Sequence, residues 1–168
     1  LAAVAVGLAC ELSLAEIVAG LESVDPVAGR LSTQPAPCGA LVIDDCYNAN
    51  PGSARAAIDT LAASEGRGIL IMGVMRELGA DSAKLHRELG RYASDAGLSG
   101  FWGVGEELRE AVAAFGDEGR WFADCEQAIE AAVTTFAQGD TVLIKGSRGA
   151  RMERVLQALM SGEAGAKS

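Results

Sequence analysis

Beyond residue 40, short apolar runs alternate with longer stretches in which apolar residues recur at a helical period. The apolar runs lie at residues 41–43, 69–72, 101–104, 121–122 and 141–144. Between them, apolar spacings of three and four residues predict amphipathic helices at residues 54–63, 85–96, 106–115, 125–136 and 152–159. Continuous apolar strands separated by helices are typical of a parallel sheet covered on both faces, so we expect a doubly wound α/β fold.

The first 24 residues lack this alternation and predict two short helices. Residues 1–12 are nearly all apolar, and Ser13 followed by Glu16 has the spacing of a helix capping box. The pair Asp25-Pro26 is expected to end the second helix. Residues 27–39 contain two prolines and show no clear period, which makes this stretch the candidate domain boundary.

The two ends of the chain carry no targeting signal that the pattern can identify. The longest apolar run, residues 1–10, is shorter than the roughly 20 residues that a membrane-spanning helix needs. No basic segment of a signal peptide precedes it. Because the first residue is Leu rather than Met, we expect a piece of a longer protein, and we expect a frayed tail beyond Gly162.

Charge and cysteine content narrow the function classes. The chain has 14 Lys and Arg against 23 Asp and Glu, a net charge of −9, which disfavours a general nucleic-acid role. The four cysteines include no CxxC pair, and the one histidine gives no zinc-ligand spacing. Widely spaced, unpaired cysteines are typical of a reducing cytosol.

The loop after the first predicted strand suggests a nucleotide. Residues 44–51 read Asp-Asp-Cys-Tyr-Asn-Ala-Asn-Pro, at the carboxyl end of a strand, where ligands bind in such sheets. A carboxylate there can accept hydrogen bonds from ribose hydroxyls, and Tyr47 can stack on a base. The pattern does not decide between Asp44 and Asp45. The alternative interpretation is an Asx-turn with a helix N-cap, which needs only one or two of these residues.

The loop after the last predicted strand suggests an anion site. Residues 145–151 read Lys-Gly-Ser-Arg-Gly-Ala-Arg and precede a predicted helix. Free backbone N–H groups, the positive end of the helix dipole and side-chain cations attract anions at such a position. A glycine-rich turn with solvated arginines is the alternative interpretation.

Residues 73–79, after the second strand, give a weaker signal. Their glycines allow close backbone approach, but the loop is neither GxGxxG nor a phosphate loop, and Arg76 with Glu77 also fits a solvated ion pair. His86, in the following helix, is more typical of a hydrogen-bonded structural residue than of a catalyst. Its neutral form could still make one hydrogen bond to a ligand.

Three segments occur together in an order that resembles the Mur ligase family of bacterial cell-wall enzymes. They are residues 44–53, residues 72–79 followed by His86, and residues 143–153. The resemblance spans nearly the whole chain, and Tyr-Asn-Ala-Asn-Pro and Lys-Gly-Ser-Arg-Gly resemble the members that add D-alanyl-D-alanine. It implies that residues 33–168 are a Rossmann-like C-terminal domain with a mostly parallel sheet. Residues 1–32 would be the last helices of a central ATP-binding domain.

The resemblance also implies an activity. It is the ATP-driven addition of D-alanyl-D-alanine to a UDP-N-acetylmuramoyl-tripeptide through an acyl phosphate, in the bacterial cytoplasm, with no nucleic-acid or membrane partner. ATP and Mg²⁺ would be held mainly by the central domain, and this chain would pack against the N-terminal domains of its own protein. Because the sequence has no phosphate loop, we expect the chain alone to be inactive.

Ligand contacts are carried over from the family onto eight positions, with no catalytic and no metal-binding residue among them. The expected contacts to ATP are Arg30, Asp45, Tyr47 and Asn50. The expected contacts to the dipeptide are Lys145, Ser147, Arg148 and His86. Val74 stands where family members often have an acidic residue, so no polar role is expected there.

Three other interpretations compete with this one. The chain could be a free-standing, non-catalytic nucleotide- or anion-binding α/β module, which a phosphate loop encoded upstream would argue against. It could be a ligase for another substrate, of the folylpolyglutamate type or another Mur enzyme, which the Tyr-Asn-Ala-Asn-Pro stretch argues against. A flavodoxin-like regulator would leave the helical prefix and the basic loop unexplained.

Overall fold

A computed structural model describes residues 2–24 and 27–162. The predicted helix end at Asp25-Pro26 and the predicted tail beyond Gly162 lie outside the described residues. Within them, one six-stranded sheet has the strand order β1-β2-β6-β3-β4-β5. Its strands are β1 (Ser32–Pro35), β2 (Leu41–Asp45), β3 (Arg67–Gly73), β4 (Gly100–Val104), β5 (Gly119–Phe122) and β6 (Asp140–Lys145).

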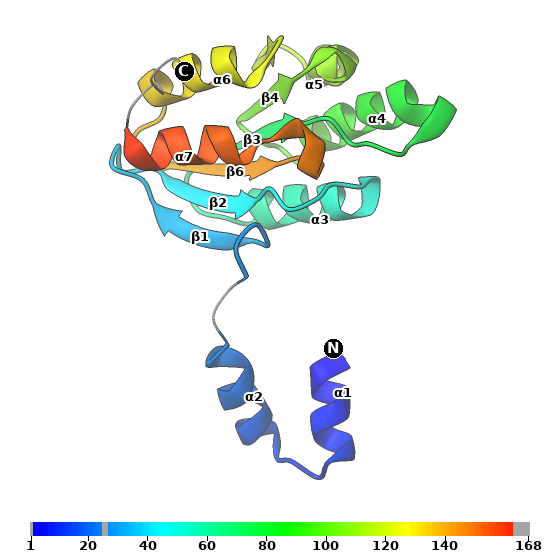
Figure 1. Cartoon of the computed structure of the whole chain (residues 1–168), viewed down its shortest axis with the longest axis vertical. Coiled ribbons are helices and arrows are strands. Elements are labelled where there is room, and N and C mark those ends of the chain that lie inside the picture. The colour runs from blue at the N-terminus through cyan, green and yellow to red at the C-terminus, as the bar shows by residue number, and fades with distance from the viewer. Residues whose placement is uncertain (1, 25–26, 163–168) are drawn as a thin grey trace.

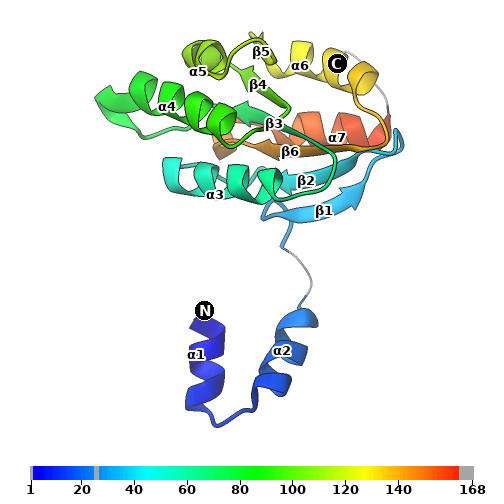
Figure 2. The same cartoon turned by 180° about the vertical axis from the view of Figure 1, so that it is seen from behind.

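Helices cover both faces of this sheet (Figure 1 and Figure 2). Successive side chains of a strand point to opposite faces: Ile69 and Ile71 pack toward α6 and α7, whereas Leu70 and Met72 pack toward α3, α4 and α5. The bounds are α3 (Pro51–Ala62), α4 (Ser82–Asp95), α5 (Arg109–Phe115), α6 (Cys125–Thr135) and α7 (Glu153–Ser161). Short 3₁₀ turns are η1 (Gly79–Asp81), η2 (Glu106–Leu108) and η3 (Arg148–Ala150). The predicted α/β fold and its five strands are confirmed.

The sixth strand was not predicted from the sequence. β1 pairs with β2 in an antiparallel register that sets Ser32 opposite Asp44 and Pro35 opposite Leu41. It lies at the sheet edge, where a proline is tolerated because one side of the strand has no partner to which it must donate. Residues 27–39, which show no clear period in the sequence, therefore contain a strand that the sequence analysis did not predict. The division between residues 32 and 33 stays a prediction.

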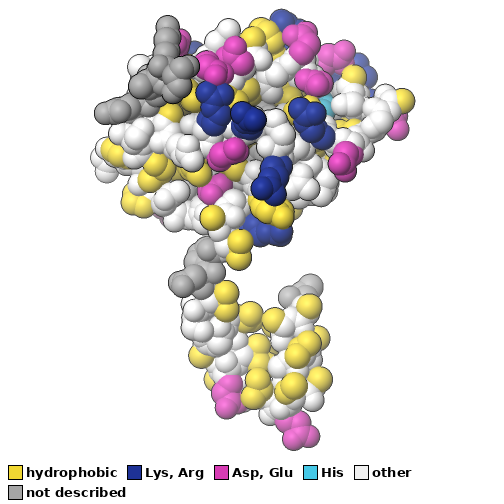
Figure 3. Space-filling view, in the orientation of Figure 1, with side chains coloured by type: hydrophobic (Ala, Val, Ile, Leu, Met, Phe, Trp, Pro, Cys, Tyr) yellow, Lys and Arg dark blue, Asp and Glu magenta, His cyan; other side chains and the backbone are white. Residues whose placement is uncertain are grey.

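Two short helices, α1 (Ala2–Ala9) and α2 (Leu14–Glu22), precede the sheet. The predicted capping box is confirmed: Ser13 N–H donates to the Glu16 carboxylate at 2.9 Å, and Glu16 N–H donates to Ser13 Oγ at 3.3 Å. Ile17 packs against Gly7, where a Cβ atom would lie only 2.7 Å from the isoleucine side chain. Hydrophobic side chains cover much of the visible surface of both helices (Figure 3). The large exposed ones are Val6 and Leu8 on α1, Leu14, Val18 and Leu21 on α2, and Leu12 between the helices.

The strand order brings three of the sequence-predicted loops together. β6 lies between β2 and β3, parallel to both. In this register Lys145 is opposite Asp45 of β2 and Met72 of β3. The loops that follow β2, β3 and β6 therefore leave the same edge of the sheet side by side, although about a hundred residues separate the first from the last.

Candidate functional site

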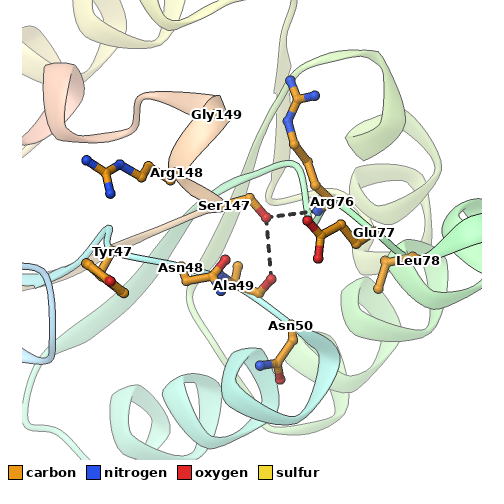
Figure 4. A pocket seen from close by; sticks show the side chains of 10 residues that line it. All are labelled: Tyr47, Asn48, Ala49, Asn50, Arg76, Glu77, Leu78, Ser147, Arg148 and Gly149. Carbon is orange, nitrogen blue, oxygen red and sulfur yellow. Dashed lines mark hydrogen bonds between the residues drawn. The ribbon is translucent and has the colours of Figure 1, made fainter.

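Two neighbouring cavities lie at this edge of the sheet. The three-loop pocket has a volume of about 520 Å³ and is lined by Tyr47, Asn48, Ala49, Asn50, Arg76, Glu77, Leu78, Ser147, Arg148 and Gly149 (Figure 4). The linker pocket has a volume of about 390 Å³ and is lined by Gly29, Arg30, Leu31, Asp45, Tyr47, Asn48, Asn50, Ser53, Ala56, Ala57 and Lys145. Tyr47, Asn48 and Asn50 line both, so the β2–α3 loop is the wall between them.

Lys145 joins β6 to the β2–α3 loop. Its side chain is only 2% exposed and forms an ion pair with Asp45, whose side chain is 15% exposed. The ammonium also donates to the carbonyl oxygen of Asn48 at 2.9 Å. A buried cation needs such partners because its desolvation is costly. Lys145 thus lines the linker pocket, pairs with the end of β2 and holds the β2–α3 loop through the Asn48 carbonyl.

Ser147 connects the other loops. Its hydroxyl accepts the Arg76 N–H at 2.8 Å and donates to the Ala49 carbonyl at 3.4 Å (Figure 4). Its own N–H donates to the Val74 carbonyl at 3.0 Å. Ser147 lines the three-loop pocket and is buried, so the expected ligand contact falls on a side chain already used to hold three loops in register.

His86 lies behind the pocket rather than in its wall. It is fully buried, and its Nε2 accepts the Met75 N–H at 3.0 Å. Its Nδ1 lies 2.8 Å from the Ser82 carbonyl oxygen. Burial lowers the pKa of His86, with the Ser82 contact and the Glu107 carboxylate acting in the opposite sense. Both ring nitrogens are therefore in use, and the imidazole has no exposed surface.

Arg76 and Arg148 supply the positive charge of the three-loop pocket, and the Glu77 carboxylate lines the same pocket. Arg76 and Arg148 are exposed and rise from separate loops beside Gly149 (Figure 4). A Cβ atom on Gly149 would lie 2.7 Å from Arg76 Nε, so the glycine leaves the room that the Arg76 side chain occupies. Across residues 2–24 and 27–162, neither guanidinium takes part in an ion pair.

The sequence analysis named Arg148 but did not assign Arg76 to a site. Its only signal was a cation in a glycine-flanked loop after a buried strand. The pairing of β3 with β6 is what brings that loop beside the basic loop. This pairing is long-range, and no local pattern reports it.

The two aspartates line different cavities and have different contacts. Asp45 lines the linker pocket. Asp44 is buried, and its carboxylate accepts the Gly29 N–H at 2.8 Å and the Cys46 N–H at 3.1 Å. Asp44 therefore holds the segment around Gly29, which precedes β1, against the sheet. Gly29 has a φ of 77°, a left-handed conformation that glycine adopts without strain.

Arg30, Tyr47 and Asn50 also line the linker pocket. The Arg30 guanidinium carbon is 4.4 Å from the centre of the Tyr47 ring, a cation–π contact beside the linker pocket. Asn50 is the N-cap of α3: its Oδ1 accepts the Ser53 N–H at 2.9 Å, and its N–H donates to Ser53 Oγ at 3.1 Å. Such a cap stabilises a helix by about 1 kcal/mol. The Asx-cap interpretation is thus confirmed for this residue, which still lines both pockets.

Neither a metal centre nor a membrane span is built from the described part of the chain. No group of three or more His, Cys, Asp or Glu side chains there is arranged to hold a metal ion. No helix among those residues is long and apolar enough to cross a membrane.

Comparison with known proteins identifies this arrangement of loops. Residues 29–148 match the family model described as "Mur ligase, glutamate ligase domain". The UDP-N-acetylmuramoyl-tripeptide–D-alanyl-D-alanine ligase of Escherichia coli (strain K12) is 38% identical over 161 residues, a match that covers 95% of this chain and 35% of that ligase. The chain thus spans about a third of the length of the curated relatives it matches.

Solved structures agree in fold. A crystal structure of MurF from Acinetobacter baumannii superposes with a TM-score of 0.81 and 36% identity over 94% of this chain and 35% of that chain. The MurF ligase from Thermotoga maritima in complex with ADP gives 0.78 and 28%, covering 94% of this chain and 36% of that chain.

Proposed function

The chain belongs to the Mur ligase family, and from this premise we propose that it is part of an ATP-dependent ligase that adds D-alanyl-D-alanine to a UDP-N-acetylmuramoyl-tripeptide. The relatives of known name support the substrates. The observation that carries the proposal is the three-loop pocket. Its two guanidinium groups form no ion pair among the described residues, and they lie beside a second pocket with a carboxylate and an aromatic ring. Two adjacent pockets of this kind suit two ligands that must react with each other.

In this proposal the three-loop pocket binds the dipeptide by its carboxylate. Arg76 and Arg148 provide planar, charge-assisted donors that match a carboxylate geometrically. Both are exposed at the pocket and free of ion pairs within the described residues, so a carboxylate would not have to displace an internal partner. Ser147 and Lys145 support this pocket by holding its loops rather than by direct contact.

The linker pocket is the proposed nucleotide site. Asp45 would accept hydrogen bonds from the ribose hydroxyls. Tyr47 and Asn50 would lie near the nucleoside, and Arg30, at the linker, would approach the phosphates. The ADP in the Thermotoga MurF structure supports nucleotide binding in this family. The placement of a nucleotide beside these four residues is our proposal.

The chain's contribution to the reaction is positioning. ATP supplies the phosphoryl group that activates the terminal carboxylate of the tripeptide. Arg76 and Arg148 would hold the dipeptide so that its free amine faces that carbonyl carbon. A bond then forms from the amine nitrogen to that carbon, phosphate leaves, and the amine loses a proton. Holding two reactants in place lowers the barrier by converting a bimolecular step into an effectively unimolecular one.

Further parts of the enzyme must supply what this sequence does not. It contains no GxxxxGK[ST] phosphate loop, and its described residues form no metal site. We assign residues 1–32 to the end of the central ATP-binding domain and residues 33–168 to the C-terminal domain. We place the enzyme in the bacterial cytoplasm, a reducing compartment that suits its free cysteines.

A titration of the isotope-labelled chain with D-alanyl-D-alanine tests the pocket assignment. We expect saturable NMR shifts of the Arg76, Ser147 and Arg148 amides. The dipeptide amide, which has no carboxylate, should bind at least about tenfold more weakly because it loses a charge-assisted contact. Equal affinity for both compounds would contradict the assignment. Binding of ADP without any binding of the dipeptide would favour the non-catalytic nucleotide-binding module.

A further inference from the structure

The loop between β3 and η1 is fixed at three successive residues. The Val74 carbonyl accepts the Ser147 N–H at 3.0 Å. The Met75 N–H donates to His86 Nε2 at 3.0 Å, and the Arg76 N–H donates to Ser147 Oγ at 2.8 Å. Ser147 reaches the loop from β6 and His86 reaches it from α4. The backbone of Arg76 is therefore held on both sides immediately before its side chain enters the pocket.

The hydrogen bonds define the protonation state of His86. A carbonyl oxygen only accepts, so the contact from Nδ1 to the Ser82 carbonyl at 2.8 Å requires a proton on Nδ1. Nε2 then carries a lone pair, which is what the Met75 N–H needs. Protonation at Nε2 would place two donors against each other. Burial favours the neutral form by lowering the pKa of His86, and the Glu107 carboxylate on η2 acts in the opposite sense.

The loop needs such an anchor. Glu77, directly after Arg76, has a φ of 64°, in the left-handed region that residues other than glycine rarely adopt. Met75 is 1% exposed, so its amide has no access to water if the imidazole is lost. A buried N–H without an acceptor is costly, and the loop would relieve both penalties by moving.

We propose that His86 is a positioning residue for the ligand-binding loop: its Nε2 holds the Met75 amide and thereby places Arg76 beside Ser147 in the three-loop pocket. This inference rests on the proposed function for its ligand and goes beyond it by naming a residue that never touches that ligand. It also corrects the expectation that His86 contacts the dipeptide.

Two substitutions at His86 test whether the hydrogen-bond acceptor at Nε2 matters apart from the rest of the side chain. His86→Gln places an amide oxygen at about the reach of Nε2, so an acceptor for Met75 remains and no longer titrates. His86→Asn reaches only as far as Nδ1 and leaves the Met75 amide without an acceptor. Both are polar, neutral and smaller than the imidazole, so they form a matched pair.

The experiment measures two quantities in the labelled chain: the exchange rate of the Met75 amide and the dissociation constant of D-alanyl-D-alanine. In His86→Asn we expect Met75 exchange to rise at least about tenfold and the dipeptide to bind about tenfold more weakly. The Leu70 amide in β3 should stay protected, which shows that the sheet is folded. In His86→Gln both quantities should stay within about threefold of the wild type.

Three results would overturn the inference. They are equal behaviour of the two variants, unchanged Met75 exchange in His86→Asn, and unchanged dipeptide affinity while Met75 exchanges freely. If the wild-type chain does not bind the dipeptide, the pocket assignment under the proposed function fails. The exchange comparison then decides the role of His86 on its own.

The pH dependence gives a readout that does not require His86→Asn to fold. The pKa of His86 is lowered in the folded chain, so the unfolded chain binds more protons as the pH falls below about 6.5, the ordinary value for histidine. We expect Met75 protection and dipeptide affinity to decrease as the pH falls from 7 to 5. His86→Gln should be flat over the same range, and an equal decrease in both proteins would contradict the role of the imidazole.

Discussion

Replacing Lys145 by methionine is expected to lower the free energy of unfolding by about 3 kcal/mol, because it breaks a buried ion pair and leaves one charge without its partner. Lys145 is 2% exposed, and its ammonium binds both the Asp45 carboxylate and the Asn48 carbonyl. Asp45 is 15% exposed, so solvent compensates part of its loss. Urea unfolding followed by circular dichroism measures the difference.

The double substitution Lys145→Met with Asp45→Asn is the matched control. It removes the orphaned carboxylate, and we expect it to recover more than half of the lost stability, which gives a clear coupling energy in a double-mutant cycle. A loss below about 1 kcal/mol for Lys145→Met would show that the pair contributes no more than a typical surface ion pair. The description of Lys145 as the anchor of the β2–α3 loop would then be wrong.

Arg76→Ala is expected to weaken the binding of D-alanyl-D-alanine about 30-fold, which corresponds to about 2 kcal/mol for a charge-assisted contact to a carboxylate. The Arg76 side chain lines the three-loop pocket and packs over Gly149. Because it is exposed and outside any ion pair in the described chain, its removal should change the free energy of unfolding by no more than about 0.5 kcal/mol. Calorimetric titration measures the affinity.

Arg91→Ala provides the control for this prediction. Arg91 is also an exposed arginine, but it lies on α4 and lines neither of the two pockets. The dissociation constant of the dipeptide for the Arg91→Ala variant should stay within about twofold of the wild-type value, since a charge outside the pocket is largely screened by salt. If both variants lose affinity equally, the dipeptide responds to overall charge, and Arg76 has no specific contact.

The sequence predicted the architecture because apolar periodicity is a local signal. The runs at residues 69–72 and 141–144 became central strands of the sheet. The sequence analysis did not predict β1, because this strand has only four residues, is polar and partly exposed, and contains Pro35. Its position depends on pairing with β2, which no spacing within residues 27–39 indicates.

The site was predicted less completely than the fold, for a related reason. Loop chemistry located Tyr47 and Arg148, and the family resemblance selected Asp45; all three line the pockets. Loop chemistry could not separate side chains that face a ligand from side chains that hold loops together. Ser147 and His86 have hydrogen bonds to distant residues, and those bonds depend on the lateral order of the strands.

The most direct test of the account replaces the matching third of the Escherichia coli ligase with this chain and measures UDP-linked pentapeptide formation from ATP, the UDP-linked tripeptide and D-alanyl-D-alanine. We predict that the chimera forms the pentapeptide, and that Arg76→Ala in the chimera slows it about 30-fold at low dipeptide concentration. A folded chimera that forms no pentapeptide, or that joins other amino acids in preference to D-alanyl-D-alanine, would contradict the central claim.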